Sequence, residues 1–103
     1  MNRRLSKLAL VSLLTFCAFG RAAAQQGVTD TEIVIGDILP LTGPPALLGV
    51  AHNLGVKAAV AEVNAAGGIN GRKIRLISED DGYVPSRTVQ GVRKLITSDK
   101  IFA

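Results

Sequence analysis

Three consecutive carboxylates, Glu79-Asp80-Asp81, follow a strand-like stretch and form the clearest group of side chains that could do chemistry. Acids at the end of a strand can bind magnesium or exchange protons with a substrate. The same acids can also stabilise the start of a following helix, because the positive end of the helix dipole attracts negative charge. The sequence leaves both interpretations open and favours the second.

No set of residues with the spacing of a catalytic centre accompanies these acids. His52 is the only histidine, and no serine, cysteine or acid lies at a suggestive spacing from it. A single histidine is too little for a metal site, because such sites normally use three or four ligands. We therefore expect His52 to lie on a helix surface, and we expect no metal, no cofactor and no enzymatic activity.

A second candidate region is the loop from Pro40 to Gly49, which leaves the carboxyl end of a predicted strand. Ligands of open α/β sheets bind beyond the carboxyl ends of the strands. Thr42, Gly43 and the backbone near Ala46 would lie there, beside a helix start whose N–H groups favour an anion such as a carboxylate. A plain connecting loop is the alternative, and position alone does not decide between the two.

The apolar pattern predicts the elements that position these residues. A nearly continuous β-branched stretch over Glu32–Leu39 predicts a strand that is covered on both faces. An alanine-rich stretch from Leu47 to Ala66 predicts a helix that ends at Gly67-Gly68. Lys73–Ser78 predicts a second strand with one face or edge in solvent. The apolar residues at helical spacing in the helix are Leu47, Ala51, Leu54, Ala58 and Val63.

A loop over Glu79–Pro85 and a second helix are predicted next. Ser86 can cap this helix, with Pro85 just outside it. Ile101-Phe102 then begins a third strand. The order β-α-β-α-(β) predicts an α/β fold with a parallel sheet. The apolar stripe of the second helix consists of Val89, Val92, Leu95 and Ile96.

The first 24 residues have the layout of a secretory signal peptide. A basic start precedes the apolar stretch Leu8–Phe19, and Ala22-Ala23-Ala24 supplies small residues for cleavage. The apolar stretch is shorter than the ~20 residues that a transmembrane helix needs. An uncleaved anchor and a lipoprotein attached through Cys17 are the alternatives. We expect cleavage after residues 1–24, which leaves residues 25–103 as a secreted mature chain.

The charge and the cysteine content differ between the signal and the mature chain. Residues 25–103 carry eight basic and eight acidic residues and therefore have no net charge. This balance predicts no nucleic-acid partner and no attachment to a membrane surface. The single cysteine, Cys17, lies in the signal. A small secreted chain without disulfides rarely completes a core, so we expect further chain to finish the fold.

Several motifs occur in the order and spacing of one protein family. The block Glu62–Lys73, with the sequence EVNAAGGINGRK, is highly specific. This pattern resembles the branched-chain amino-acid (Leu/Ile/Val) binding proteins of ABC transporters, and the resemblance covers essentially all of the mature chain. The shorter motifs that agree with it are Ile33–Gly36, Pro40–Gly43, Gly49, Asp80-Asp81 and Pro85.

The resemblance implies a Rossmann-like parallel sheet that is the truncated first lobe of a two-lobed periplasmic binding protein. In this family two lobes close over a small ligand and deliver it to an ABC permease in the inner membrane. The implied ligand is an amino acid or a similar small solute, without a cofactor. A ligand-sensing ectodomain of a receptor or regulator with the same fold is the alternative.

The resemblance also suggests two residues of the ligand cleft. Leu48 matches a position that is often aromatic and lies over the ligand. Tyr83 matches a position that is a cysteine in the best-known leucine binders, so their disulfide is not expected here. Its ring would reach the mouth of the cleft, and plain packing is the alternative. Most ligand contacts of the family lie beyond Ala103, so we expect no tight binding by residues 25–103 alone. The expected site residues are Thr42, Gly43, Ala46, Leu48 and Tyr83.

Overall fold

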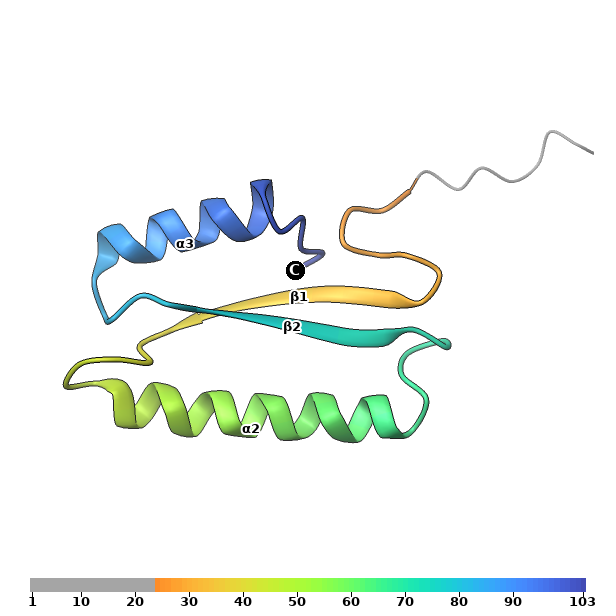
Figure 1. Ribbon diagram of the computed structural model, residues 1–103, viewed down its shortest axis with the longest axis horizontal. Coiled ribbons are helices and arrows are strands. Elements are labelled where there is room, and N and C mark those ends of the chain that lie inside the picture. Colours follow the sequence, from red (N-terminus) through yellow and green to blue (C-terminus); the bar gives the residue numbers. More distant parts are fainter. Residues whose placement is uncertain (1–23) are drawn as a thin grey trace, which may run out of the picture.

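The computed structural model describes residues 24–103 (Figure 1). The predicted signal peptide lies outside the described residues except for its last residue. The order strand–helix–strand–helix agrees with the prediction. The elements are β1 (Glu32–Leu39), α2 (Ala46–Ala65), β2 (Lys73–Asp80) and α3 (Pro85–Thr97).

β1 and β2 form a parallel two-stranded sheet. The register pairs Glu32 with Lys73 at one end and Leu39 with Asp80 at the other. α2 and α3 lie on opposite sides of the sheet, so that each face carries one helix (Figure 1). The predicted α/β fold with parallel strands is confirmed. Both strands point the same way, so their carboxyl ends meet at one edge of the sheet.

β2 is two residues longer than the sequence predicts. Glu79 and Asp80 belong to the strand, where they pair with Ile38 and Leu39 of β1. The prediction that these two acids lie in a loop is therefore wrong. Pairing with β1 outweighs the low strand preference of acidic residues, because that preference depends strongly on context. Of the acidic stretch, Asp81 alone lies in the loop.

α3 begins without the predicted serine cap. Pro85 is its first residue, and Val84 is the N-cap without a side-chain hydrogen bond. Proline is favoured at this position, because the first N–H groups of a helix have no partner within the helix. The predicted cap by Ser86 is therefore wrong. Leu95, which is 3% exposed, is the residue of the predicted stripe that packs fully against the sheet. The remaining stripe residues stay exposed: Val89, Val92 and Ile96.

The other edge of β1 pairs with segments from both ends of the described chain. The Val34 N–H donates to the Gly27 carbonyl at 2.7 Å, and the Val34 carbonyl accepts the Phe102 N–H at 2.8 Å. The Gly36 N–H donates to the Ala103 carbonyl at 2.8 Å. The hydrogen bonds of Phe102 and Ala103 lie where the sequence predicts the start of a third strand, although residues 101–103 do not form a regular strand.

Small and polar side chains attach α2 to the sheet. Gly49 and Asn53 are its buried residues. The Asn53 amide donates to the Ser78 hydroxyl at 2.7 Å. Asn64 accepts the Ile74 N–H at 2.7 Å and donates to the Ile74 carbonyl at 2.8 Å. These directional contacts fix how α2 lies on β2.

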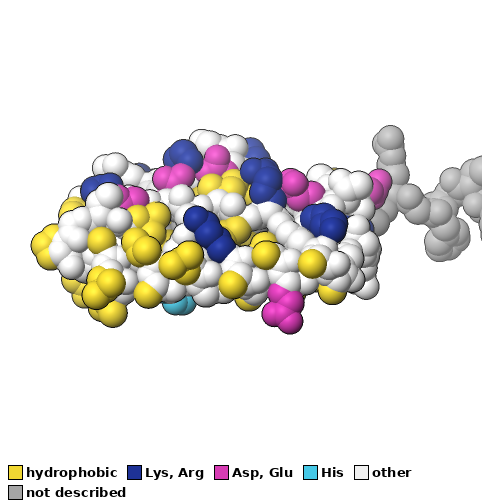
Figure 2. All heavy atoms as spheres, turned by 60° about the horizontal axis from the view of Figure 1, so that its bottom comes forward, with side chains coloured by type: hydrophobic (Ala, Val, Ile, Leu, Met, Phe, Trp, Pro, Cys, Tyr) yellow, Lys and Arg dark blue, Asp and Glu magenta, His cyan; other side chains and the backbone are white. Residues whose placement is uncertain are grey.

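The outer face of α2 is apolar. Leu47 and Leu54 belong to the predicted series at helical spacing, yet they are 81% and 64% exposed. Figure 2 shows hydrophobic side chains gathered at one end of this face. Among the described residues, α2 is the one helix long and apolar enough to cross a membrane by length and composition. Asn53 and Asn64 nevertheless hold its other face on the sheet, as in the connecting helix of a β-α-β unit.

Candidate functional site

The loops that follow β1 and β2 lie together at the carboxyl ends of the strands. The first loop runs from Pro40 to Pro45 and the second from Asp81 to Val84. Ligands of parallel sheets bind at this edge, because the loops there leave a crevice between neighbouring connections. These two loops and the helix starts beside them are therefore the candidate functional site.

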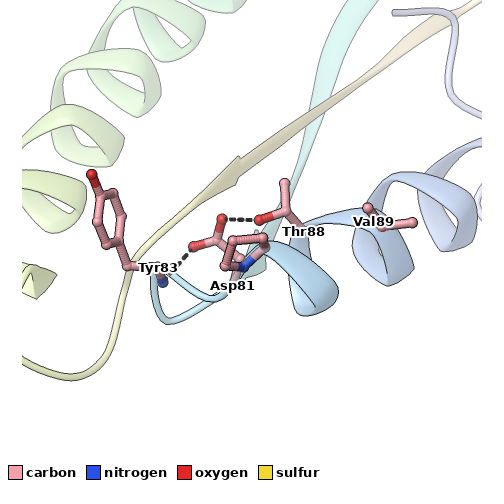
Figure 3. Close-up of a pocket in the computed structure, with 5 residues that line it drawn as sticks. Asp81, Tyr83, Thr88 and Val89 are labelled. Carbon is pink, nitrogen blue, oxygen red and sulfur yellow. Dashed lines mark hydrogen bonds between the residues drawn. The ribbon is translucent and has the colours of Figure 1, made fainter.

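Asp81 organises the second loop and is buried, with 8% of its surface exposed. Its Oδ1 accepts the Tyr83 N–H at 2.9 Å, and its Oδ2 accepts the Thr88 hydroxyl at 2.6 Å (Figure 3). The Thr88 hydroxyl, and after it the Tyr83 N–H, lowers the pKa of the Asp81 carboxyl below its ordinary value. The carboxylate thereby joins the loop to the first turns of α3.

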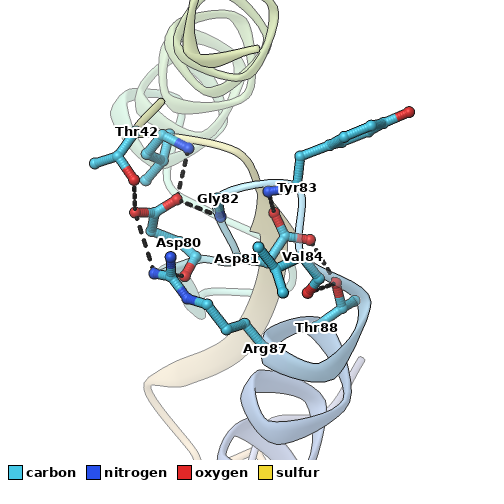
Figure 4. A network of polar contacts seen from close by, with 9 residues as sticks. Thr42, Asp80, Asp81, Gly82, Tyr83, Val84, Arg87 and Thr88 are labelled. Atoms are coloured by element: carbon cyan, nitrogen blue, oxygen red, sulfur yellow. Dashed lines mark hydrogen bonds and ion pairs between the residues drawn. The ribbon is translucent and has the colours of Figure 1, made fainter. Parts of the chain in front are cut away.

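The Asp80 carboxylate connects the two loops to each other (Figure 4). Its Oδ1 accepts the Leu41 N–H at 2.8 Å and the Gly82 N–H at 2.9 Å. Its Oδ2 accepts the Thr42 hydroxyl at 2.6 Å and lies 3.5 Å from the Arg87 guanidinium. Arg87 also donates to the Asp80 carbonyl at 2.9 Å. One side chain therefore holds donors from both loops and from α3.

These donors keep Asp80 ionised. The Thr42 hydroxyl has the largest effect and the Leu41 N–H follows, and together with Gly82 and Arg87 they hold the pKa of the Asp80 carboxyl far below its ordinary range. A carboxylate that stays ionised at neutral pH does not act as a general acid, and its oxygens already bind protein donors. Of the two interpretations of the acidic stretch, the structure supports a stabilising role.

We expect acid to weaken the fold through Asp80 and Asp81. Both carboxyls have a folded-state pKa below the ordinary value of 3.8, so the unfolded chain takes up protons first as the pH falls. The stability that they contribute is complete above about pH 5 and is lost as the pH falls through their folded-state pKa values. Urea unfolding of residues 25–103 from about pH 6 to about pH 2 measures this loss.

The change Asp81→Asn tests which group causes the loss of stability in acid. It should make the free energy of unfolding depend less on pH, because one of the two titrating carboxyls is gone. The matched control is Asp30→Asn, at an exposed position, which should leave the dependence unchanged. An acid loss that is equally steep in Asp81→Asn and in the unchanged chain would show that other groups cause it.

An apolar hollow of about 580 Å³ lies between the first loop, the start of α2 and Tyr83. The two residues suggested by the family resemblance, Leu48 and Tyr83, both lie at this hollow. Among residues 24–103 their side chains are 77% and 76% exposed. The lining consists of Leu39, Pro40, Pro45, Leu48, Gly49, His52 and Tyr83.

The other three predicted residues are not among those that line the hollow. Thr42 gives its hydroxyl hydrogen to Asp80. Gly43 turns the chain with a φ of +80°, and its carbonyl accepts the Ala46 N–H at 3.1 Å. The N–H of Ala46 is therefore already paired and is not a free donor for an anion.

His52 lines the hollow, and the sequence analysis did not place it there. The side chain is exposed, as expected for a histidine on a helix surface. It lies four residues after Leu48 on α2, so both side chains share one face of the helix. That spacing is the signal that could have identified it. Within residues 24–103, no three side chains of the kinds that bind metals come together.

Known proteins match this chain over the elements that carry the site. Residues 32–103 match the family model of periplasmic binding proteins. An amino acid binding protein of Pseudomonas aeruginosa is 40% identical over 72 residues, which are 70% of this chain and 19% of that protein.

Solved structures show the same fold. The branched-chain amino acid transporter substrate binding protein LivJ from Streptococcus pneumoniae, in complex with isoleucine, matches with a TM-score of 0.67 and 32% identity, over 69% of this chain and 20% of that one. A fatty acid ABC transporter substrate-binding protein from Thermomonospora curvata matches with a TM-score of 0.65 and 33% identity, over 74% of this chain and 19% of that one.

The chain spans about a fifth of the length of these relatives. The family match begins at the first residue of β1 and includes both loops of the candidate site. It agrees with the parallel sheet, with the helices on its two faces and with the block Glu62–Lys73 that the sequence analysis found most specific. The chain belongs to the periplasmic binding protein family.

Proposed function

We propose that this protein is the solute-binding component of an ABC importer and that residues 25–103 form the beginning of its first lobe. The observation that carries the proposal is the apolar hollow at the carboxyl ends of β1 and β2. It lies where ligands of parallel sheets bind, in a chain that belongs to the periplasmic binding protein family. The signal-like residues 1–24 would deliver the protein to the periplasm, where an inner-membrane ABC permease receives the solute.

The ligand is an amino acid or a similar small solute with an apolar side chain. Leu48, Pro40 and Pro45 offer apolar surface to such a side chain. Among the described residues, no carboxylate or basic side chain apart from His52 lines the hollow, so the charged groups of the ligand would be held elsewhere. Amino acid binding is also the activity in the name of the Pseudomonas aeruginosa relative.

The protein acts by binding and not by catalysis. Asp80 binds residues of the first loop and Asp81 binds the Tyr83 N–H, so the oxygens of both acids already accept hydrogen bonds from the protein. Release to the permease would follow opening of the two lobes, because a ligand that touches both lobes favours the closed state.

We expect leucine to bind weakly to residues 25–103. The hollow supplies one wall of a cleft, so the affinity should fall in the millimolar range, at about −4 kcal/mol, and not in the micromolar range. A titration followed by amide NMR should shift the signals of Leu48, His52 and Tyr83. Saturation at micromolar leucine would contradict the view that most ligand contacts lie beyond these residues.

Two exposed leucines of α2 provide a matched pair of variants. Leu48→Ala removes a lining residue of the hollow and should weaken leucine binding several-fold, because buried apolar area is lost. Leu54→Ala removes a similar exposed side chain that does not line the hollow and should have no effect. Equal effects of the two variants would place the ligand away from the hollow.

A further inference from the structure

Tyr83 has a backbone conformation that is unfavourable for a tyrosine. Its φ is +62°, and it follows Gly82 with a φ of +56°. The left-handed region crowds the Cβ of any residue other than glycine, and asparagine tolerates it better than tyrosine does. Within residues 24–103 the ring is 76% exposed, so no contact among these residues compensates for the strain. Strain at an exposed aromatic residue of a candidate site points to a role in function.

Asp81 holds Tyr83 in this conformation. Its Oδ1 accepts the Tyr83 N–H at 2.9 Å, while its Oδ2 is fixed by the Thr88 hydroxyl at 2.6 Å. The Asp81 carbonyl also accepts the Val84 N–H at 2.9 Å, which closes the turn around Tyr83. Because Asp81 is buried and both of its oxygens are engaged, the turn has one well-defined geometry.

The ring of Tyr83 borders two hollows. On one side lies the hollow at the start of α2, with Leu48 and Pro45 in its lining. On the other side lies a second hollow of about 450 Å³, which is lined by Asp81, Tyr83, Pro85, Thr88 and Val89 (Figure 3). The ring extends away from α3 toward α2 in this view, and Tyr83 is one of the residues that line the first hollow.

We propose that Tyr83 determines the specificity of this site for solutes with a flat aromatic side chain, and that Asp81 is the residue that positions it. The proposal rests on the proposed function and deepens it. A ring held on a rigid turn loses little freedom when a second ring stacks on it. Offset or edge-to-face contact between two rings adds to the gain from apolar burial, whereas a branched aliphatic side chain gains from burial alone.

Phenylalanine and leucine are the probes that test the preference. Titrations of the full-length mature protein should show that phenylalanine binds about 3- to 10-fold more tightly than leucine. Tyr83→Leu keeps an apolar side chain and should reduce this ratio to about one. Asp81→Ala should also reduce the ratio of the two affinities. Asp81→Asn should leave this ratio unchanged, because the amide oxygen can still accept the Tyr83 N–H.

A second measurement tests the strain without any ligand. Tyr83→Gly should raise the melting temperature by about 4 °C, because glycine adopts the left-handed conformation freely. The same variant should lose the preference for phenylalanine. Higher stability combined with lost selectivity is the result that a purely structural tyrosine would not give. A fall in melting temperature would show that the ring packs usefully and would overturn the proposal.

The outcomes separate this proposal from the proposed function. If both amino acids bind the hollow equally and Tyr83→Leu changes nothing, the hollow binds solutes but Tyr83 does not select them, which overturns the proposal alone. If neither amino acid shifts the signals of Leu48 or Tyr83 at the limit of solubility, the proposed function of the hollow fails as well. If Asp81→Ala does not fold, the ratio of phenylalanine to leucine affinity in Tyr83→Leu and in Asp81→Asn still tests the proposal.

Discussion

Replacing Gly49 by alanine should destabilise the fold strongly, although alanine is normally the better helix residue. A Cβ at position 49 would lie 1.8 Å from the Pro40 carbonyl oxygen and 2.6 Å from the carbonyl carbon. Both atoms belong to the backbone, so they cannot move aside as a flexible side chain does. Overpacking of this kind costs about 1–3 kcal/mol, and we expect the upper end because α2 and the first loop must separate.

Gly55 provides the matched control for this prediction. It lies in the same helix, and nothing is within 4 Å of the position that its Cβ would take. Gly55→Ala should therefore stabilise the chain by up to about 1 kcal/mol through helix preference alone. Urea unfolding of both variants gives the comparison. If both variants were more stable than the unchanged chain, α2 would not approach Pro40 as closely as the structure shows.

Replacing Asn64 by alanine should cost about 2–4 kcal/mol. The Asn64 amide bonds both the N–H and the carbonyl of Ile74, at 2.7 and 2.8 Å, and thereby fixes the end of α2 to the start of β2. Alanine leaves both backbone groups without this partner, at about 1–3 kcal/mol for each group that stays buried. This is a large share of the total stability of a small domain, which is about 5–15 kcal/mol.

The change Asn64→Asp shows whether both hydrogen bonds matter. An aspartate can still accept the Ile74 N–H, but its second oxygen then faces the Ile74 carbonyl and repels it. Its loss of stability should therefore be close to that of Asn64→Ala. Glu62→Ala, at an exposed position of the same helix, is the control and should stay within about 0.5 kcal/mol of the unchanged chain. A small loss of stability in Asn64→Asp would indicate that the hydrogen bond from the Ile74 N–H is sufficient to hold α2 on β2.

The order of the elements could be predicted from the sequence, because the β-branched and alanine-rich stretches differ clearly in period. Which side of α2 is buried could not be predicted from the sequence. Leu47 and Leu54 follow helical spacing and face solvent, while Gly49 and Asn53 face the sheet. Hydrophobicity does not mark a helix face that is held by hydrogen bonds and close backbone contact.

The candidate site was predictable only in part. The family resemblance suggested Leu48 and Tyr83, and both lie at the hollow. That Asp80 joins the two loops was not predictable, because it pairs with Thr42, which is 38 residues away in the sequence. Contacts of this length depend on the register of the sheet, which is fixed only when the two strands pair. The ligand-binding roles of these residues remain predictions.

The pairing of β1 has a consequence for the order of events during synthesis. Val34 is 5% exposed, and its backbone is completed by Gly27 on one side of the sequence and by Phe102 on the other. The first strand to leave the ribosome therefore stays incompletely paired until nearly 70 further residues have followed it. Contacts of such long range slow folding, because the chain must close a large loop before it gains from them. β1 therefore gains its last backbone partner late in synthesis, well after β2 has been made.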